Sequence, residues 1–159
     1  MENSFLTHIK RFIQPEFIEA LSLNSSDSKE SLQKAYDVTI PSILKKINDS
    51  DSSVLQNILS KAQNVFTGSG DMNSRLSSVS NIISELFGSD YGTLKQSVSN
   101  YANISSTSTD SVLKTSFIGI LDYFKDLTPD FDFSIIKNFI SSKMPEINGL
   151  IPASLSGFA

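Results

Sequence analysis

Cysteine and tryptophan are absent from this sequence of 159 residues, and histidine occurs once. Without cysteine the chain has no disulfide bond, no thiolate metal site and no cysteine nucleophile. The one histidine, His8, has no second histidine with which to share a transition-metal ion, and no Gly-x-Ser-x-Gly turn presents a serine to it. We therefore expect no metal, no cofactor and no hydrolytic triad.

Charge is also sparse. Charged residues make up 19% of the chain, the formal net charge is −4, and the only adjacent basic residues are the pairs at 10–11 and 45–46. Proteins that bind nucleic acid normally carry a basic patch, so we expect no nucleic acid partner. The longest apolar run, residues 117–121, is far below the ~20 residues of a membrane span, and residues 1–11 lack the apolar core of a signal peptide. The sequence thus predicts a cytoplasmic protein without a transmembrane segment.

The chain is rich instead in serine, with 30 residues, and it holds eleven phenylalanines. Serine favours helix starts and turns because its hydroxyl competes for backbone groups. Between the serine-rich turns, apolar residues recur at three- and four-residue spacing, and no segment alternates with period two as a strand would. These patterns predict an all-α fold: a single domain of about eight short-to-medium helices.

Proline, glycine and capping residues divide the chain into these helices. Residues 1–14 form an amphipathic N-terminal helix that ends ahead of Pro15. Pro41 falls inside the apolar pattern of a long third helix, where it predicts a kink or a break, and Pro145 begins a C-terminal tail. The predicted starts and stops are residues 48–51 between the third and fourth helices, Asp71 and Gly88 for the fifth, Ser105 or Ser106 for the seventh, and Asp132 or Ser134 for the eighth.

The apolar stripes of the helices predict which residues face the core. In the third helix they are Leu32, Ala35, Tyr36, Ile40, Ile43, Leu44 and Ile47, in the fourth Leu55, Ile58, Leu59, Ala62, Val65 and Phe66, and in the fifth Leu76, Val79, Ile82, Ile83, Leu86 and Phe87. In the sixth helix they are Leu94, Val98, Tyr101 and Ala102, in the seventh Leu113, Phe117, Ile120, Leu121, Phe124 and Leu127, and in the eighth Ile135, Ile136, Phe139 and Ile140.

A weak internal two-fold repeat is also predicted, with halves at about residues 15–68 and 86–127. Residues 23–26 correspond to residues 104–107, and Ile43–Leu44 corresponds to Ile120–Leu121. The first spacing is 81 and the second 77, and a difference of four residues is about one helical turn, which keeps the buried face. Each half would consist of a short helix, a serine-rich turn and a long core helix.

Three stretches place apolar, glycine and proline residues in an order known from a bacterial family. They are Ile40-Pro41-Ser42-Ile43-Leu44; Leu86-Phe87-Gly88 with Val98, Tyr101-Ala102, Ile104-Ser105 and residues 117–121; and Ser142-Lys143 with Ile147 and residues 150–156. This layout resembles the YidB-like bacterial domains of unknown function. The resemblance covers residues 15–158, with C-terminal helices at 134–158, and departs from the family at Asn103, where glycine is usual.

The resemblance implies a possible longer protein around this chain. Similar domains occur N-terminal to a membrane anchor and a peptidoglycan-binding OmpA-like domain. It therefore implies that the chain is the soluble head of a cell-envelope protein, tethered to the inner membrane on its cytoplasmic side. The resemblance implies nothing about an activity.

Three short motifs and a set of glutamates resemble parts of known binding or catalytic sites, but each is better explained as a helix cap, a turn or a solvent-exposed face. Residues 49–53 begin like a calcium loop, but the glycine and the bidentate glutamate that such a loop needs are missing. Residues 68–70 form a glycine-rich turn without the strand and lysine of a phosphate loop. Asp130 and Asp132 have no further carboxylate to complete a set, and Glu16, Glu19, Glu30 and Glu85 lie on polar faces. The sequence thus names no catalytic residue and predicts that the protein is not an enzyme.

The aromatic residues leave two functions open. Residues Phe12, Phe17, Tyr36, Phe66, Phe87, Phe117 and Phe124 form an aromatic stripe. Such residues are usually core, but they also line grooves for partner helices or apolar ligands. Our first hypothesis is a non-catalytic helical module that binds another protein, or a second copy of itself, or that holds an assembly together. The alternative is a carrier or sensor of a small apolar ligand held between helices.

Overall fold

The computed structural model describes residues 9, 23, 27–50, 53–54, 56–58, 60–61, 72–128 and 132–151. Within these ranges the elements are α3 (Lys29–Asp49), α5 (Met72–Phe87), the 3₁₀ turn η1 (Gly88–Asp90), α6 (Tyr91–Ala102), α7 (Ser106–Leu127) and α8 (Phe133–Leu150). The described residues between 53 and 61 are helical as well, and no strand occurs among the described ranges. The all-α class is confirmed. The predicted helix over residues 1–14 and the predicted cap Asp71 lie outside the described residues.

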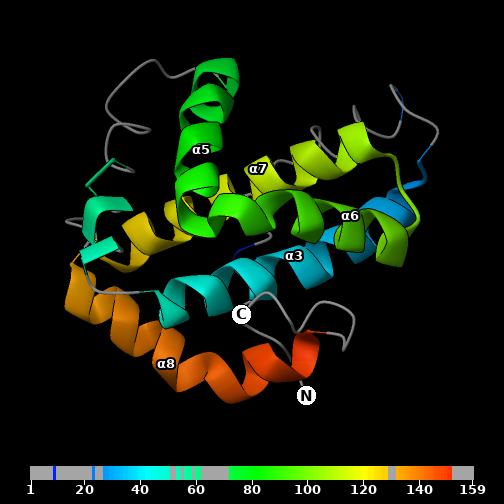
Figure 1. Ribbon diagram of the computed structural model, residues 1–159. Helices are drawn as coiled ribbons and strands as arrows, with labels where there is room; N and C mark the ends of the chain where they lie inside the picture. The colour runs from blue at the N-terminus through cyan, green and yellow to red at the C-terminus, as the bar shows by residue number, and fades with distance from the viewer. Residues whose placement is uncertain are drawn as a thin grey trace.

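Helices α3 and α7 form the centre of the fold and pack against each other (Figure 1). Both begin at the same end of the molecule, so they run in roughly the same direction. Helix α8 covers α3 from one side, while α6 lies across both central helices and α5 packs on α7. The buried apolar residues of all five helices join into one hydrophobic core. This arrangement makes the two longest helices the frame on which the shorter ones are placed.

Helix α3 begins at a serine cap and passes through a proline. The Ser28 Oγ atom accepts a hydrogen bond from the Ser31 backbone N–H at 3.1 Å, which satisfies an otherwise unpaired donor. The helix continues without interruption through Pro41, so the predicted break is wrong, and a kink there stays a prediction. Pro41 has no N–H to donate, but the Ser42 hydroxyl donates to the Val38 carbonyl oxygen at 2.8 Å in that turn. Tertiary burial of the residues on both sides outweighs the cost of the proline, about 3 kcal/mol.

Helix α7 begins with the same device. The Ser105 Oγ atom accepts from the Ser108 N–H at 3.1 Å, which identifies Ser105 as the cap. In both central helices the cap hydroxyl also lies 3.0 Å from the hydroxyl of the serine three residues further along, Ser31 in α3 and Ser108 in α7. The caps Ser28 and Ser105 are 77 residues apart, the same spacing as between the apolar pairs at 43–44 and 120–121. One spacing of 77 therefore relates the two helices, in place of the predicted change from 81 to 77. The repeat itself stays a prediction, since much of residues 15–68 lies outside the described residues.

Helix α8 also begins where the sequence predicts. The Asp132 carboxylate accepts from the N–H groups of Ser134 and Ile135, at 2.9 and 3.2 Å, so Asp132 is the cap. The predicted tail from Pro145 is wrong in its first part, because α8 continues through Pro145 to Leu150. Ile147 beyond the proline is fully buried, and this packing favours a continued helix.

The predicted core is confirmed at most of the positions whose burial is described. Residues that the sequence places inward but the structure leaves exposed are Tyr101 at 36%, Leu127 at 38% and Ile135 at 45%. Each lies at the edge of an apolar stripe or within the last or first turn of its helix, where fewer neighbours cover it. Tyr101 instead lies beneath the Lys34 ammonium, 4.6 Å from the ring centroid. The predicted core residues Leu55, Leu59, Ala62, Val65, Phe66 and Leu76 lie outside the residues whose side chains are described.

Two left-handed residues turn the chain on either side of α6. Gly88 ends α5 with φ +57°, as the sequence predicts, and Asn103 ends α6 with φ 60°. Asparagine is the residue that most readily replaces glycine in this conformation. The departure at Asn103 from the glycine usual in YidB-like domains therefore leaves the turn geometry intact.

Substitution by alanine should have opposite effects on stability at Gly88, which begins η1, and at Gly92, in the first turn of α6. A Cβ atom at Gly88 would meet nothing, but the positive φ makes Gly88→Ala cost about 1–2 kcal/mol. Gly92 lies within α6 with open space at its Cβ position and no positive φ, so we expect Gly92→Ala to stabilise by about 0.5–1 kcal/mol. Urea denaturation of the two variants measures this. Changes of equal sign would contradict the backbone assignment.

Two buried threonine hydroxyls of the central helices, those of Thr115 and Thr39, differ in their hydrogen bonding. Thr115 donates its hydroxyl proton to the Ser111 carbonyl oxygen at 2.7 Å, so Tyr36 is the donor in the 2.7 Å bond between the Tyr36 hydroxyl and Thr115 Oγ1. Burial raises the pKa of Tyr36 to about 12, so Tyr36 keeps its proton at neutral pH. Thr39 is fully buried too, yet its hydroxyl finds no hydrogen-bond partner among the described residues.

This contrast predicts opposite effects for one substitution at two threonines. Thr39→Val replaces an unsatisfied hydroxyl by a methyl group of the same size, and we expect it to raise the free energy of unfolding by about 1 kcal/mol. Thr115→Val removes the acceptor of the Tyr36 hydroxyl and should lower the free energy of unfolding. Thermal and urea unfolding of both variants distinguish the cases. A loss of stability in Thr39→Val would show that the Thr39 hydroxyl has a partner in solution.

Candidate functional site

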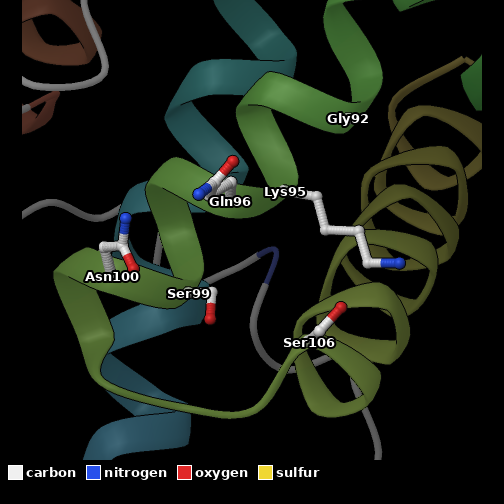
Figure 2. A pocket seen from close by; sticks show the side chains of 6 residues that line it. All are labelled: Gly92, Lys95, Gln96, Ser99, Asn100 and Ser106. Carbon is white, nitrogen blue, oxygen red and sulfur yellow. The ribbon is translucent and has the colours of Figure 1, made fainter.

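A groove lies between α6 and the first turn of α7, with a volume of about 490 Å³ (Figure 2). Five of its lining residues come from α6 and one from α7. They are Gly92, Lys95, Gln96, Ser99, Asn100 and Ser106. In Figure 2 the Lys95 side chain reaches across toward α7, and Ser99 points into the space between the two helices. Each of the lining side chains that the structure describes is polar or charged, and Gly92 has no side chain to cover the backbone.

The groove wall is the polar face of an amphipathic helix. Residues three and four apart lie on one side of a helix, and the lining residues at 92, 95, 96, 99 and 100 follow that spacing. The opposite face of α6 is buried through Leu94, Val98 and Ala102. Burial of one face therefore fixes the direction in which the other face presents its side chains.

The turn between α6 and α7 is held by several hydrogen bonds. The Ser99 hydroxyl donates to the Ile104 carbonyl oxygen at 2.5 Å, and the Ile104 N–H donates to the Ser99 carbonyl oxygen at 3.1 Å. The Ser105 N–H and hydroxyl donate to the Asp27 carboxylate, with the shortest contacts at 3.2 Å. Asp27 precedes α3, so this contact ties the starts of both central helices together. The start of α7 is thus already capped from within the protein.

A charged cluster borders the groove on the side of Lys95. The Asp110 carboxylate accepts from the Tyr91 hydroxyl at 2.5 Å and from the Lys114 ammonium at 2.8 Å, while the Lys95 ammonium lies 3.8 Å away. Partial burial by itself would raise the pKa of Asp110. The hydrogen bonds from Lys114 and Tyr91 and the charges of both lysines outweigh burial and lower that pKa below its ordinary value. Asp110 is therefore a carboxylate at neutral pH.

The pKa of Tyr91 is shifted in the opposite direction, upward. Burial, its hydrogen bond to Asp110 and the negative charge of that carboxylate all raise the pKa of Tyr91 far above its ordinary value. The phenol therefore stays protonated and donates permanently to Asp110. The Asp110 carboxylate is thus a fixed anion that orients the ammonium groups of both Lys95 and Lys114.

None of the described residues of the sequence motifs is among the described residues that line this groove. His8, Asp51, residues 68–70, Asp130, Glu16 and Glu19 lie outside the described residues. Asp49 and Ser50 end α3, as the capping interpretation predicts, and Asp132 caps α8. Glu30 and Glu85 are exposed, and Glu85 pairs with Lys61 at 2.8 Å. Of the aromatic stripe, Tyr36, Phe87, Phe117 and Phe124 are core.

The sequence analysis did not single out the cluster around Asp110. One part of it has a local signal, because Asp110 and Lys114 are four residues apart on one helix. Tyr91 and Lys95 lie on a different helix, and the sequence contains no sign of their approach. The cluster depends on how α6 packs on α7.

The described residues hold neither a cluster of metal-ligating side chains nor a membrane-spanning helix. No group of three His, Cys, Asp or Glu side chains gathers in the described part of the chain. Among the described helices, none is long and apolar enough to cross a membrane. Comparison with known proteins finds no matching family model, curated protein or solved structure. The resemblance to YidB-like domains therefore stays a prediction.

Proposed function

We propose that this domain is a non-catalytic helical module that binds another protein, and that the α6–α7 groove is the contact surface. The observation that carries the proposal is the groove itself, a row of hydrogen-bonding side chains presented by a helix whose other face is buried. The helix start beside it is held by the Asp27 contact. A preformed polar surface on a rigid element loses little freedom when a partner binds.

The electrostatics of the cluster support a binding role over acid–base catalysis. A general acid or base works best when its pKa lies near the working pH. The pKa of Asp110 is lowered and that of Tyr91 is raised, so both move away from neutrality. Each group instead holds one protonation state, which suits a fixed charge pattern that a partner recognises.

The alternative, a carrier of a small apolar ligand, gains no support from this groove. An apolar ligand would cover the side-chain amides of Gln96 and Asn100 without offering them a hydrogen bond, which costs free energy. The further expectation that the domain is the head of a bacterial envelope protein rests on the YidB-like resemblance alone.

Site-specific photo-crosslinking tests the proposal. A benzophenone amino acid replaces Gln96 in the groove, and in a control protein it replaces Asn138, an exposed residue of α8. We expect a discrete protein adduct in the cells that produce the domain from the Gln96 position and none from the Asn138 position. The same adducts from both positions, or no protein adduct from Gln96, would contradict the proposal.

A further inference from the structure

We propose that the groove takes an extended, acidic segment of the partner protein, with a carboxylate at Lys95 and the main chain of the segment against the bare backbone at Gly92. This inference rests on the proposed function and names the chemistry of the partner. Three separate observations on charge, on backbone access and on hydrogen-bonding groups support it.

The charge on the Lys95 side of the groove is positive, whereas the Asp27 carboxylate lies at the start of α7. Two lysines share the single Asp110 carboxylate, so the cluster of Lys95, Lys114 and Asp110 has a net charge of about +1, while the whole chain carries −4. Lys114 makes the closer contact at 2.8 Å, and the Tyr91 hydroxyl occupies the oxygen that faces Lys95. The Lys95 ammonium, at 3.8 Å, is the least neutralised of these groups, and it is the one that lines the groove. An anionic group on the partner would complete its pairing.

The backbone is accessible at Gly92. Glycine inside a helix costs about 0.5–1 kcal/mol relative to alanine. At Gly92 neither a positive φ nor a close neighbour requires it, because a Cβ atom there would meet none of the described residues within 4 Å. The packing of the described residues thus gives no reason for this glycine. A segment lying against α6 would give one, because glycine is the residue that permits the closest approach to a backbone.

The remaining groups suit a peptide main chain. The side-chain amides of Gln96 and Asn100 each offer donors and an acceptor, and they lie one turn apart along the groove (Figure 2). An extended peptide presents N–H and C=O groups at a similar repeat. A nucleic acid would require several more cations than Lys95, the one lysine among the described residues that line the groove.

A titration with capped peptides followed by amide NMR tests the inference. The probes are the pentapeptide Ala-Ala-Asp-Ala-Ala, acetylated and amidated at its ends, and its matched partner Ala-Ala-Asn-Ala-Ala. We expect both to shift amide signals of residues 92–106, with the aspartate peptide binding about two- to fivefold more tightly, as an exposed ion pair contributes. Equal affinities, shifts scattered over the protein, or the same shifts with inorganic phosphate would overturn the inference.

Matched variants locate the binding site. Lys95→Met should remove the preference for the aspartate peptide, whereas Lys143→Met on α8 should leave it unchanged. Gly92→Leu should weaken both peptides at least fivefold by filling the groove, whereas Gly149→Ala, also at a site with open space around its Cβ position, should not. Thermal unfolding confirms that each variant is folded. Unchanged binding by a folded Gly92→Leu protein would exclude the backbone contact.

The two experiments separate the two proposals. A protein adduct at Gln96 without any peptide preference would leave the interaction module standing and reject the acidic segment. Peptide binding at residues 92–106 that depends on Lys95, without an adduct in cells, would reject a protein partner at the groove in those cells. The preference of the groove for an acidic peptide would still stand.

Discussion

Replacement of Phe117 by alanine is expected to lower the free energy of unfolding by about 3–5 kcal/mol. Phe117 is fully buried at the middle of α7, where this helix meets α3 and the rest of the core. Alanine removes the ring and leaves a cavity that the surrounding helices fill only in part, so both lost burial and lost packing contribute. Urea denaturation monitored by circular dichroism measures the change.

Leu127→Ala is the control, because Leu127 ends the same helix and is 38% exposed. We expect less than about 1 kcal/mol for it, as most of its side chain has little contact to lose. A loss of less than about 0.5 kcal/mol in Phe117→Ala would mean that α7 turns a different face to the core.

Replacement of Asp110 by alanine is expected to lower the free energy of unfolding by about 1.5–3 kcal/mol at pH 7, the range for hydrogen bonds to a charged group. The substitution leaves the partly buried Tyr91 hydroxyl without its acceptor and places the Lys95 and Lys114 ammonium groups side by side without an anion. Unfolding in urea at pH 7 measures the difference. Glu146→Gln, in an exposed pair with Lys143, is the control and should cost less than about 1 kcal/mol.

The same substitution should become less costly in acid. The pKa of Asp110 is lower in the folded than in the unfolded chain, so the folded state gains most where the carboxylate is ionised in both. This gain is complete above the unfolded pKa, about 4, and is lost as pH falls through the folded pKa. We expect the gap between the wild-type protein and Asp110→Ala to be constant from pH 6 to 7 and to shrink below pH ~4. A gap that widens in acid would contradict the lowered pKa.

The sequence predicts a helix boundary well where the deciding contact is local. Ser105 and Asp132 cap their helices through side chains that reach only two or three residues along the chain, and Gly88 stops α5 through its own φ angle. The buried faces of α3 and α7 follow from spacing alone, because one side of a helix must meet the core. These features are encoded within a few residues of where they appear.

The prolines show where local rules fail. Pro41 and Pro145 each predict an interruption, yet both lie inside continuous helices. The cost of a proline is about 3 kcal/mol, and the burial of several apolar neighbours, such as Ile40 and Ile43 beside Pro41, exceeds it. The strength of that burial depends on α7 and α8, which lie far along the chain from Pro41.

By itself, then, the sequence determined the all-α class, the caps Ser105 and Asp132 and most of the core whose burial is described, because these depend on residues that are neighbours in the chain. The tertiary structure decided the paths through the prolines, the exposure of Tyr101 and Ile135, and the groove beside the Asp110 cluster. Tyr91 and Lys95 meet Asp110 only because the turn at Asn103 folds α6 back onto α7. Such long-range contacts depend on how whole helices pack, and no spacing within a single helix specifies them.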